Sequence, residues 1–263
     1  MRYTDKGVSG MLDEFDNKSK AMIEPRTCLG RIKVDVAIVT FSRKIAEEID
    51  ERYACRIATS LISVSESVDV LVFAKDGVTI AAYKSPIGGP ASAGALEEFN
   101  ASVEAKHVIV FGSAGCLDRE IEFGQIMVPV RAYRDEGTSY HYLPESDWVG
   151  LENWEIVFDF FTQRLIKIST GGVWTTDAIF RETRNNVKKH KADGCIAVDM
   201  ECASLQAVCK FRGIQLYYFF MGDDLLDAPV WVDRISEPLE ANTKHDFQYF
   251  ELAVKMAVWL CKI

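Results

Sequence analysis

Four polar clusters in this 263-residue chain carry the side chains best suited to chemistry. They read GSAG at 112–115, DME at 199–201, GDD at 222–224 and VWTTDAIFRETR at 173–184. The first three follow apolar stretches that are typical of buried strands. Because ligands of open α/β sheets bind beyond the carboxyl ends of the strands, these clusters are candidates for one shared site.

Small residues at the first cluster allow backbone N–H groups to approach an anion or a sugar closely. Ser113, after Gly112, adds a hydroxyl group to such a site. The same residues are also typical of a tight turn that allows close packing. The sequence leaves both interpretations open.

The second cluster places two carboxylates, Asp199 and Glu201, on either side of Met200 and beside a buried strand. Carboxylates in such a position are costly to bury without partners. We expect Asp199 to serve the start of the following helix, where negative charge is favoured. We expect Glu201 to bind vicinal hydroxyls, while Met200 offers an adaptable apolar surface to a sugar.

The third cluster brings Asp223 to the end of an apolar stretch, where shielding from water can raise a carboxyl pKa and make the group a proton donor. A turn residue satisfied by local N–H groups is the alternative, and it suits Asp224 and Asp227 well. In the fourth cluster, Trp174 and Phe180 offer flat surfaces to a base.

The elements that must position these clusters alternate along the chain. Apolar patterns predict strands at 34–40, 70–74, 78–83, 107–111, 125–130, 195–198 and 215–221, and helices at 42–53, 91–105, 152–168, 200–211 and 243–260. This alternation predicts one three-layer α/β/α domain over residues 31–263. The polar residues 1–30 are interpreted as an N-terminal arm.

Composition narrows the classes of function. The net charge is −9 and no dense Lys/Arg run occurs, which argues against nucleic-acid binding. Seven cysteines without a CxxC motif indicate reduced thiols and no metal site. Since the N-terminus lacks an apolar signal region and no apolar run has the length of a membrane span, we expect a soluble cytoplasmic protein without membrane contact.

Taken together, the motifs GSAG, WTTDA, VDMEC and GDDL resemble those of the purine nucleoside and uridine phosphorylase family, in order and nearly in spacing. The resemblance spans about residues 34–230, and the segment RDEGTSYHY at 134–142 is similar to one in the uridine-cleaving branch. It implies a mixed central sheet and a homo-oligomer, dimeric or hexameric, in which a neighbouring subunit completes the site.

The resemblance also implies a reaction, in which phosphate attacks the anomeric carbon of a nucleoside and releases a free base and ribose 1-phosphate. Inorganic phosphate is then a co-substrate, and no cofactor or metal is expected. The resemblance assigns Arg43, Gly112 and Ser113 to phosphate, Met200 and Glu201 to ribose, Trp174, Thr175 and Phe180 to the base, and Asp223 to protonation of the leaving base.

Three departures from the family pattern keep alternatives open. Thr40-Phe41-Ser42-Arg43 lacks the glycine of the first phosphate loop, and Val110 stands where phosphorylases usually carry an arginine. A nucleosidase, which uses water, also lacks that arginine, so hydrolysis is the first alternative. Arg181-Glu182-Thr183-Arg184 replaces the Gln-x-Arg that reads uracil. Together with Asp223, this favours a purine or a broad substrate range over uridine phosphorolysis. A non-catalytic nucleoside sensor is the third hypothesis.

Overall fold

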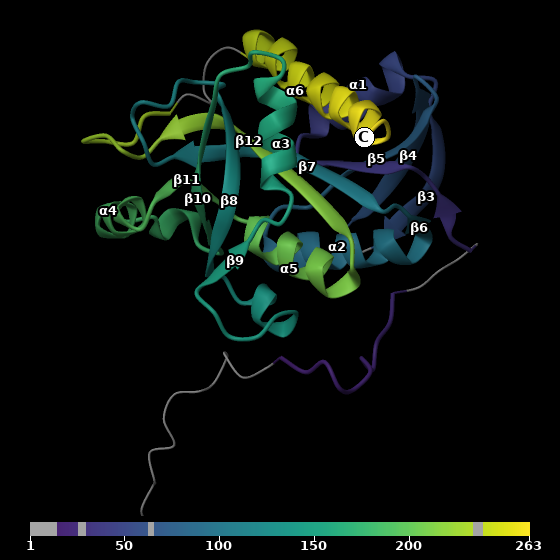
Figure 1. Ribbon diagram of the computed structural model, residues 1–263, viewed down its shortest axis with the longest axis horizontal. Coiled ribbons are helices and arrows are strands. Elements are labelled where there is room, and N and C mark those ends of the chain that lie inside the picture. The colour runs from purple at the N-terminus through teal and green to yellow at the C-terminus, as the bar shows by residue number, and fades with distance from the viewer. Residues whose placement is uncertain (1–14, 26–29, 63–65, 234–238) are drawn as a thin grey trace, which may run out of the picture.

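A ten-stranded mixed sheet forms the centre of the molecule, with helices on both of its faces (Figure 1). The computed structural model describes residues 15–25, 30–62, 66–233 and 239–263. The strands are β1 Ile32–Lys33, β2 Val36–Thr40, β3 Arg56–Ile62, β4 Ser67–Lys75, β5 Val78–Lys84, β6 Val103–Glu104, β7 His107–Cys116, β8 Ile126–Asp135, β9 Trp148–Gly150, β10 Ile168–Thr176, β11 Cys195–Asp199 and β12 Gln215–Leu225. The helices are α1 Arg43–Arg52, α2 Gly89–Ser102, α3 Trp154–Thr162, α4 Arg184–Ala192, α5 Cys202–Arg212 and α6 Leu239–Leu260.

The strand order brings together segments that are distant in the sequence. Strands pair in the order β11-β10-β8-β12-β7-β2-β5-β4-β3, and β11 also pairs with β7. The strands β7, β12, β8, β10 and β11 therefore close into a ring. Because β7 runs parallel to β12 and meets the end of β11 at Gly115 and Cys116, three of the four polar clusters converge at one place.

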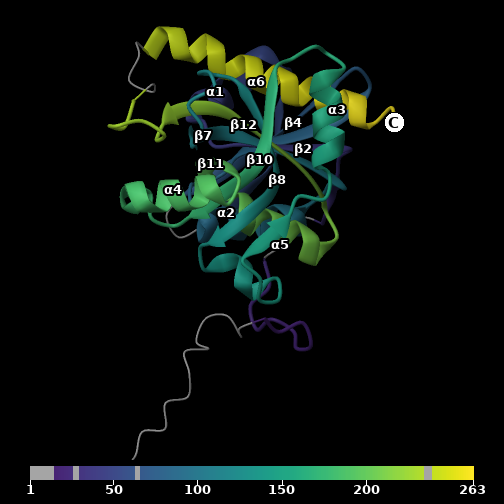
Figure 2. The ribbon, with the colours of Figure 1, turned by 60° about the vertical axis from the view of Figure 1, so that its left-hand side comes forward.

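Two apolar cores lie on opposite faces of the sheet, as expected for three layers. Helices α2 and α5 pack together over one face, while α1, α3 and α6 cover the other (Figure 2). On the second face, Phe111 and Phe219 stack with ring centroids 5.5 Å apart and contact Phe161 and Phe250. The predicted three-layer α/β/α architecture with a mixed sheet is confirmed.

The predictions for the start of α1 and for the end of α5 are confirmed. Ser42 caps α1 by accepting a hydrogen bond from the backbone N–H of Ile45, and Gly213 ends α5 in the left-handed conformation with φ of 70°. Six cysteines lie within the described residues and all are free thiols.

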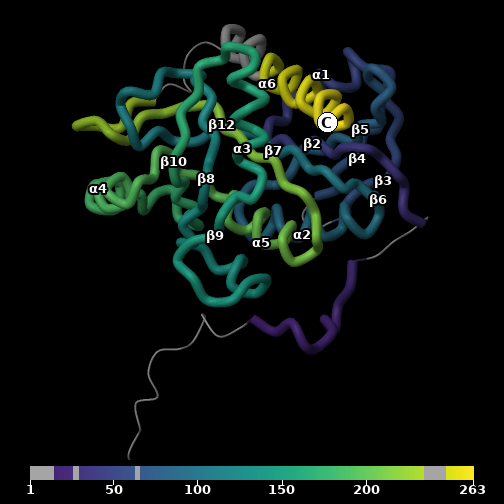
Figure 3. The backbone as a smooth tube through the Cα atoms, in the orientation of Figure 1, coloured from purple at the N-terminus to yellow at the C-terminus, as the bar shows by residue number. Residues whose placement is uncertain are grey.

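The arm is described only at 15–25 and 30, where it lies outside the helix-and-sheet body (Figure 3). The division into an arm at 1–30 and a domain at 31–263 stays a prediction.

Other boundaries were wrong because glycines do not interrupt the strands. Strand β7 continues through 112–115, and β12 continues through 222–224, so neither segment is a turn. Gly171 and Gly172 lie inside β10, where the pairing with β8 shifts by one residue. Glycine within a strand marks such a bulge or a close approach. Helix α3 is also shorter than predicted, and the strands β1, β3, β6, β9 and β10 and the helix α4 were not predicted.

Close packing of α2 on α5 depends on a small residue at Gly89. A Cβ atom added there would lie 2.5 Å from Ser204 Oγ, and that hydroxyl donates a hydrogen bond of 2.6 Å to Glu136. We therefore expect Gly89→Ala to lower the free energy of unfolding by about 1–3 kcal/mol, measured by urea denaturation. Gly94, in the same helix, has no neighbour within 4 Å of an added Cβ, so Gly94→Ala is expected to stabilise by about 1 kcal/mol. Equal effects of the two substitutions would contradict this packing account.

Candidate functional site

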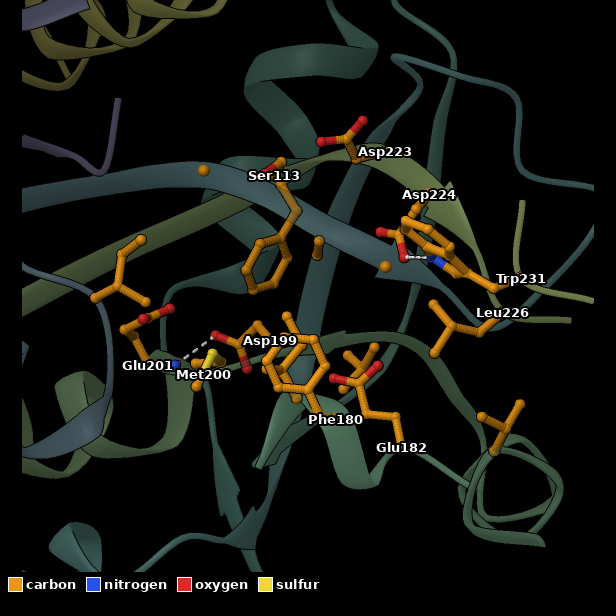
Figure 4. A pocket seen from close by; sticks show the side chains of 18 of the residues that line it. Ser113, Phe180, Glu182, Asp199, Met200, Glu201, Asp223, Asp224, Leu226 and Trp231 are labelled. Carbon is orange, nitrogen blue, oxygen red and sulfur yellow. Dashed lines mark hydrogen bonds between the residues drawn. The ribbon is translucent and has the colours of Figure 1, made fainter. Parts of the chain in front are cut away.

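A pocket of about 560 Å³ opens where the polar clusters converge (Figure 4). Strand β7 supplies Gly112 and Ser113 to its wall, and the turn after β11 supplies Met200 and Glu201. Strand β12 supplies Asp223. The structure thus places all five of these predicted site residues around one cavity. Further lining residues from the same and other segments include Phe41, Ile87, Phe180, Glu182, Arg184, Asp199, Tyr218, Phe220, Asp224, Leu226 and Trp231.

Glu201 lies at one end of this pocket (Figure 4). Its side chain is only 7% exposed, and Oε1 accepts a 2.6 Å hydrogen bond from the backbone N–H of Gly88, just before α2. Burial and the nearby carboxylate of Asp199 raise the pKa of Glu201. A buried carboxylate of this kind gains most from partners that donate hydrogen bonds, as the hydroxyls of a sugar do.

Asp199 positions this end of the pocket. Its Oδ2 accepts hydrogen bonds from the backbone N–H groups of Glu201 (3.0 Å) and Cys202 (2.6 Å), at the start of α5. Its Oδ1 accepts a 2.7 Å bond from the Thr175 hydroxyl. Burial raises the pKa of Asp199, and these three hydrogen bonds oppose that effect. The expectation that Asp199 serves the helix start is therefore confirmed.

The two predicted base-lining residues on β10 do not lie on the pocket wall. Trp174 is 1% exposed, stacks on His190 at 4.3 Å and donates its Nε1–H to Asp135. Thr175 is fully buried behind Asp199, where its Oγ1 accepts the backbone N–H of Ala203. The Trp174 ring and the Thr175 hydroxyl therefore contact other protein groups. Of the three residues predicted to bind the base, only Phe180 lines the pocket, where it is 96% exposed.

The predicted phosphate residue Arg43 also lies away from the pocket. It lies in the exposed first turn of α1, where its guanidinium forms an ion pair with Glu47 at 2.9 Å. From the same segment, Phe41 lines the pocket wall. Val110 is buried within β7. Among the described residues that line the pocket, Arg184 alone is positively charged, and its guanidinium donates to the carbonyl of Pro229.

Two neighbouring acids on β12 are oriented differently. Figure 4 shows the Asp223 carboxylate directed away from Asp199 and Met200, whereas the Asp224 carboxylate is directed toward the pocket and bonded to Trp231. Alternate residues of a strand face opposite sides, which accounts for the difference. Asp224, which the sequence suggested to be a turn residue, thus lies in the pocket wall.

Glu182 is a pocket residue that sequence reasoning missed. It lies in the segment between β10 and α4, is half-buried and lines the cavity. Burial and the proximity of Asp224 raise its pKa to about 7. The signal available in the sequence was the departure at 181–184 from the pattern of uridine phosphorylases.

Comparison with known families agrees with this architecture. The model of the phosphorylase superfamily matches residues 35–249, most of the chain. The chain belongs to the phosphorylase superfamily. The resemblance inferred from the motifs is confirmed by this match.

Relatives of this phosphorylase-superfamily chain are distant in sequence. An uncharacterised protein of Acanthamoeba polyphaga mimivirus is 25% identical over 162 residues, which cover 59% of this chain and 62% of the relative. A DeoD-type purine nucleoside phosphorylase of Bacillus cytotoxicus is 23% identical over 141 residues, covering 52% and 60%. The chain therefore spans about three fifths of the length of these relatives.

Solved structures of the superfamily share the fold. Uridine phosphorylase from Vibrio fischeri has a TM-score of 0.71 at 20% identity, covering 93% of this chain and all of its own. Purine nucleoside phosphorylase from Toxoplasma gondii gives 0.69 at 20% identity, with 87% and 92% covered. A nucleosidase from Campylobacter jejuni that acts on 5'-methylthioadenosine and S-adenosylhomocysteine gives 0.64 at 16% identity, with 85% and 98% covered. The fold is thus common to members with different reactions.

Within the described residues, no group of three or more His, Cys, Asp or Glu side chains is arranged to hold a metal ion. None of the described helices combines the length and apolar character that crossing a membrane requires.

The buried Thr175 hydroxyl offers a test of how the site is held. Thr175→Val removes a donor to Asp199 and an acceptor for the Ala203 N–H while keeping the side-chain shape. We expect it to lower the free energy of unfolding by about 1–3 kcal/mol, because both buried partners lose a hydrogen bond. Thr175→Ser retains the hydroxyl and is the control. Chemical denaturation measures both, and a Val variant as stable as the Ser variant would contradict this role.

Proposed function

We propose that this protein cleaves the N-glycosidic bond of a purine nucleoside, with inorganic phosphate as the acceptor and free base and ribose 1-phosphate as products. One observation carries the proposal. A buried carboxylate, Glu201, shares a pocket with the backbone of Gly112 and Ser113 and with the acid Asp223, as the family's reaction requires. Membership of a superfamily that contains phosphorylases and nucleosidases supports the reaction class.

In the proposed reaction, Glu201 binds the ribose hydroxyls and Met200 contacts the sugar face. Negative charge around the sugar stabilises the oxocarbenium-like transition state as the base departs. Gly112 and Ser113 present backbone and hydroxyl donors to the acceptor. Asp223 gives a proton to the leaving purine, which requires its carboxylate to turn from the orientation seen in Figure 4.

Hydrolysis is the second candidate, and the charge of the pocket favours it. Five acids line the cavity against one described cation, Arg184, which is bonded to Pro229. Those of the acids that are ionised repel a phosphate dianion unless a cation comes from elsewhere, because like charges at short range cost free energy in a shielded site. Water carries no charge and meets no such penalty. The acids are Glu182, Asp199, Glu201, Asp223 and Asp224.

We further propose a homo-oligomer in the cytoplasm that needs no metal or organic cofactor and takes part in purine salvage. A neighbouring subunit that contributes a cation such as Arg43 would supply the positive charge that phosphorolysis requires. This part of the proposal rests on the family resemblance.

Inosine, adenosine and uridine, each incubated with and without inorganic phosphate, test the acceptor and the base. We expect purine release at least about tenfold faster with phosphate, and ribose 1-phosphate as product by chromatography. Base release at the same rate without phosphate would establish hydrolysis instead. Binding without release of any base would refute an enzyme and favour a nucleoside sensor.

Substitution of the neighbouring acids tests the proton donor. We expect Asp223→Asn to slow purine cleavage by about 100-fold or more, because proton transfer to the leaving group contributes a factor of this order. Asp224→Asn is the matched control, with a smaller effect on kcat. Steady-state kinetics of inosine cleavage and circular dichroism of each variant give the readout. An unchanged kcat in Asp223→Asn would remove this residue from the mechanism.

A further inference from the structure

The two ends of the pocket differ in chemistry. Glu201 and Met200 lie at one end, and Glu182 lies toward the other with Leu226 and Trp231 (Figure 4). A nucleoside has the same polarity, with hydroxyls on the ribose and a flat ring on the base. If the ribose binds Glu201, the base extends toward Glu182.

The end around Glu182 suits a flat, largely apolar ring. Phe180, which is 96% exposed, and Trp231, which is 59% exposed, both line the cavity there, together with Leu226. Aromatic rings exposed at a pocket rim gain from stacking on a planar ligand. A polar side chain among these apolar groups is therefore well placed to select the base.

Glu182 is a polar residue at this end of the pocket whose carboxyl group is open to a ligand. Among the described residues, none donates a hydrogen bond to its carboxyl group, although the side chain is half-buried. Asp224, by contrast, accepts a 2.5 Å hydrogen bond from Trp231 Nε1. A shielded carboxyl group without a protein partner has capacity to bind a ligand.

The charges around Glu182 favour its neutral form. Asp224 on β12 acts on it electrostatically, and a nearby like charge disfavours the ionised form of a carboxyl group. Arg184, at the start of α4, is the lining cation, but its guanidinium is directed to Pro229. Trp231 already donates a hydrogen bond to Asp224, whereas no described residue donates one to the Glu182 carboxyl group. Burial and Asp224 raise the pKa of Glu182 to about 7, which favours the protonated form of this group below that pH.

We propose that Glu182 is the base-recognition residue, and that its protonated carboxyl group donates a hydrogen bond to an acceptor atom on the edge of the base far from the ribose. This inference rests on the proposed function, because it uses the placement of ribose at Glu201. The role differs from that of Asp223, which protonates the leaving base. It also selects bases that present a ring nitrogen or a carbonyl oxygen at that edge.

The proposal fixes the direction of a pH effect. Below about pH 7 Glu182 holds its proton and donates, and above it the carboxylate repels an acceptor atom. Base affinity is therefore expected to fall about tenfold between about pH 6 and pH 8, because the protonated fraction falls by that factor. Adenine and uracil stay neutral over this range, so the change belongs to the protein.

Calorimetric binding of adenine and of uracil to the full chain at about pH 6 and pH 8 tests this inference. For a base that binds the wild type, we expect the tenfold loss at the higher pH. Glu182→Gln keeps a donor N–H that does not titrate, so its affinity is expected to be independent of pH. Glu182→Ala is expected to bind weakly at both values, and Glu145→Gln, an exposed control, is expected to match the wild type.

Three outcomes would overturn the inference: a wild-type affinity that does not change with pH, a Glu182→Gln variant that keeps the wild-type pH dependence, or no binding of either base at about pH 6. Nucleoside cleavage is measured separately by chromatography. Proton-dependent base binding without cleavage would contradict the proposed function and leave this inference standing. Nucleoside cleavage together with pH-independent base binding would support the proposed function and contradict the role of Glu182.

Discussion

The site depends on the buried carboxylate of Asp199 and the hydrogen bonds that satisfy it. Two backbone N–H groups at the start of α5 and the hydroxyl of Thr175 from β10 meet on this one group. The helix start, with its unpaired donors, supplies what an isolated buried carboxylate lacks. This arrangement fixes the turn after β11, and with it the position of Glu201. Glu201 in turn binds the N–H of Gly88, so the start of α2 is joined to the same network.

Close packing around this network limits which residues can stand there. Gly89 allows α2 to approach Ser204 of α5, and Ser204 is itself bonded to Glu136 from the segment after β8. The segment at 134–142, which resembles one in uridine-cleaving enzymes, thus lies beneath the two helices, where Arg134 donates to Ser139 and to three loop carbonyls. The hydrogen bonds of this segment join it to the loop at 143–146 and to α5.

Strand and helix positions were largely predictable because each is a local pattern. The apolar run at 36–40 and the cap at Ser42 are examples in which neighbouring residues decide the structure. The convergence of Ser113, Glu201 and Asp223 on one pocket was predictable from their positions after buried strands. The predictions that failed depended on which side chains contact one another in the folded protein. Trp174 could stack on a base, but in the structure its ring stacks on His190 and its Nε1–H donates to Asp135. Neither contact has a signal in the sequence. Glu182 is the converse, a surface-like residue that the fold partly buries beside Asp224.

In the proposed complex, a nucleoside binds with its ribose on Glu201 and its base toward Glu182. The most direct measurement is a crystal structure of the protein soaked with inosine or, if turnover is fast, with ribose and the free base. We expect density for the ribose hydroxyls at the Glu201 carboxylate and for the ring between Phe180 and Trp231. Density in the reverse orientation, or ordered ligand at another surface with this pocket empty, would contradict it.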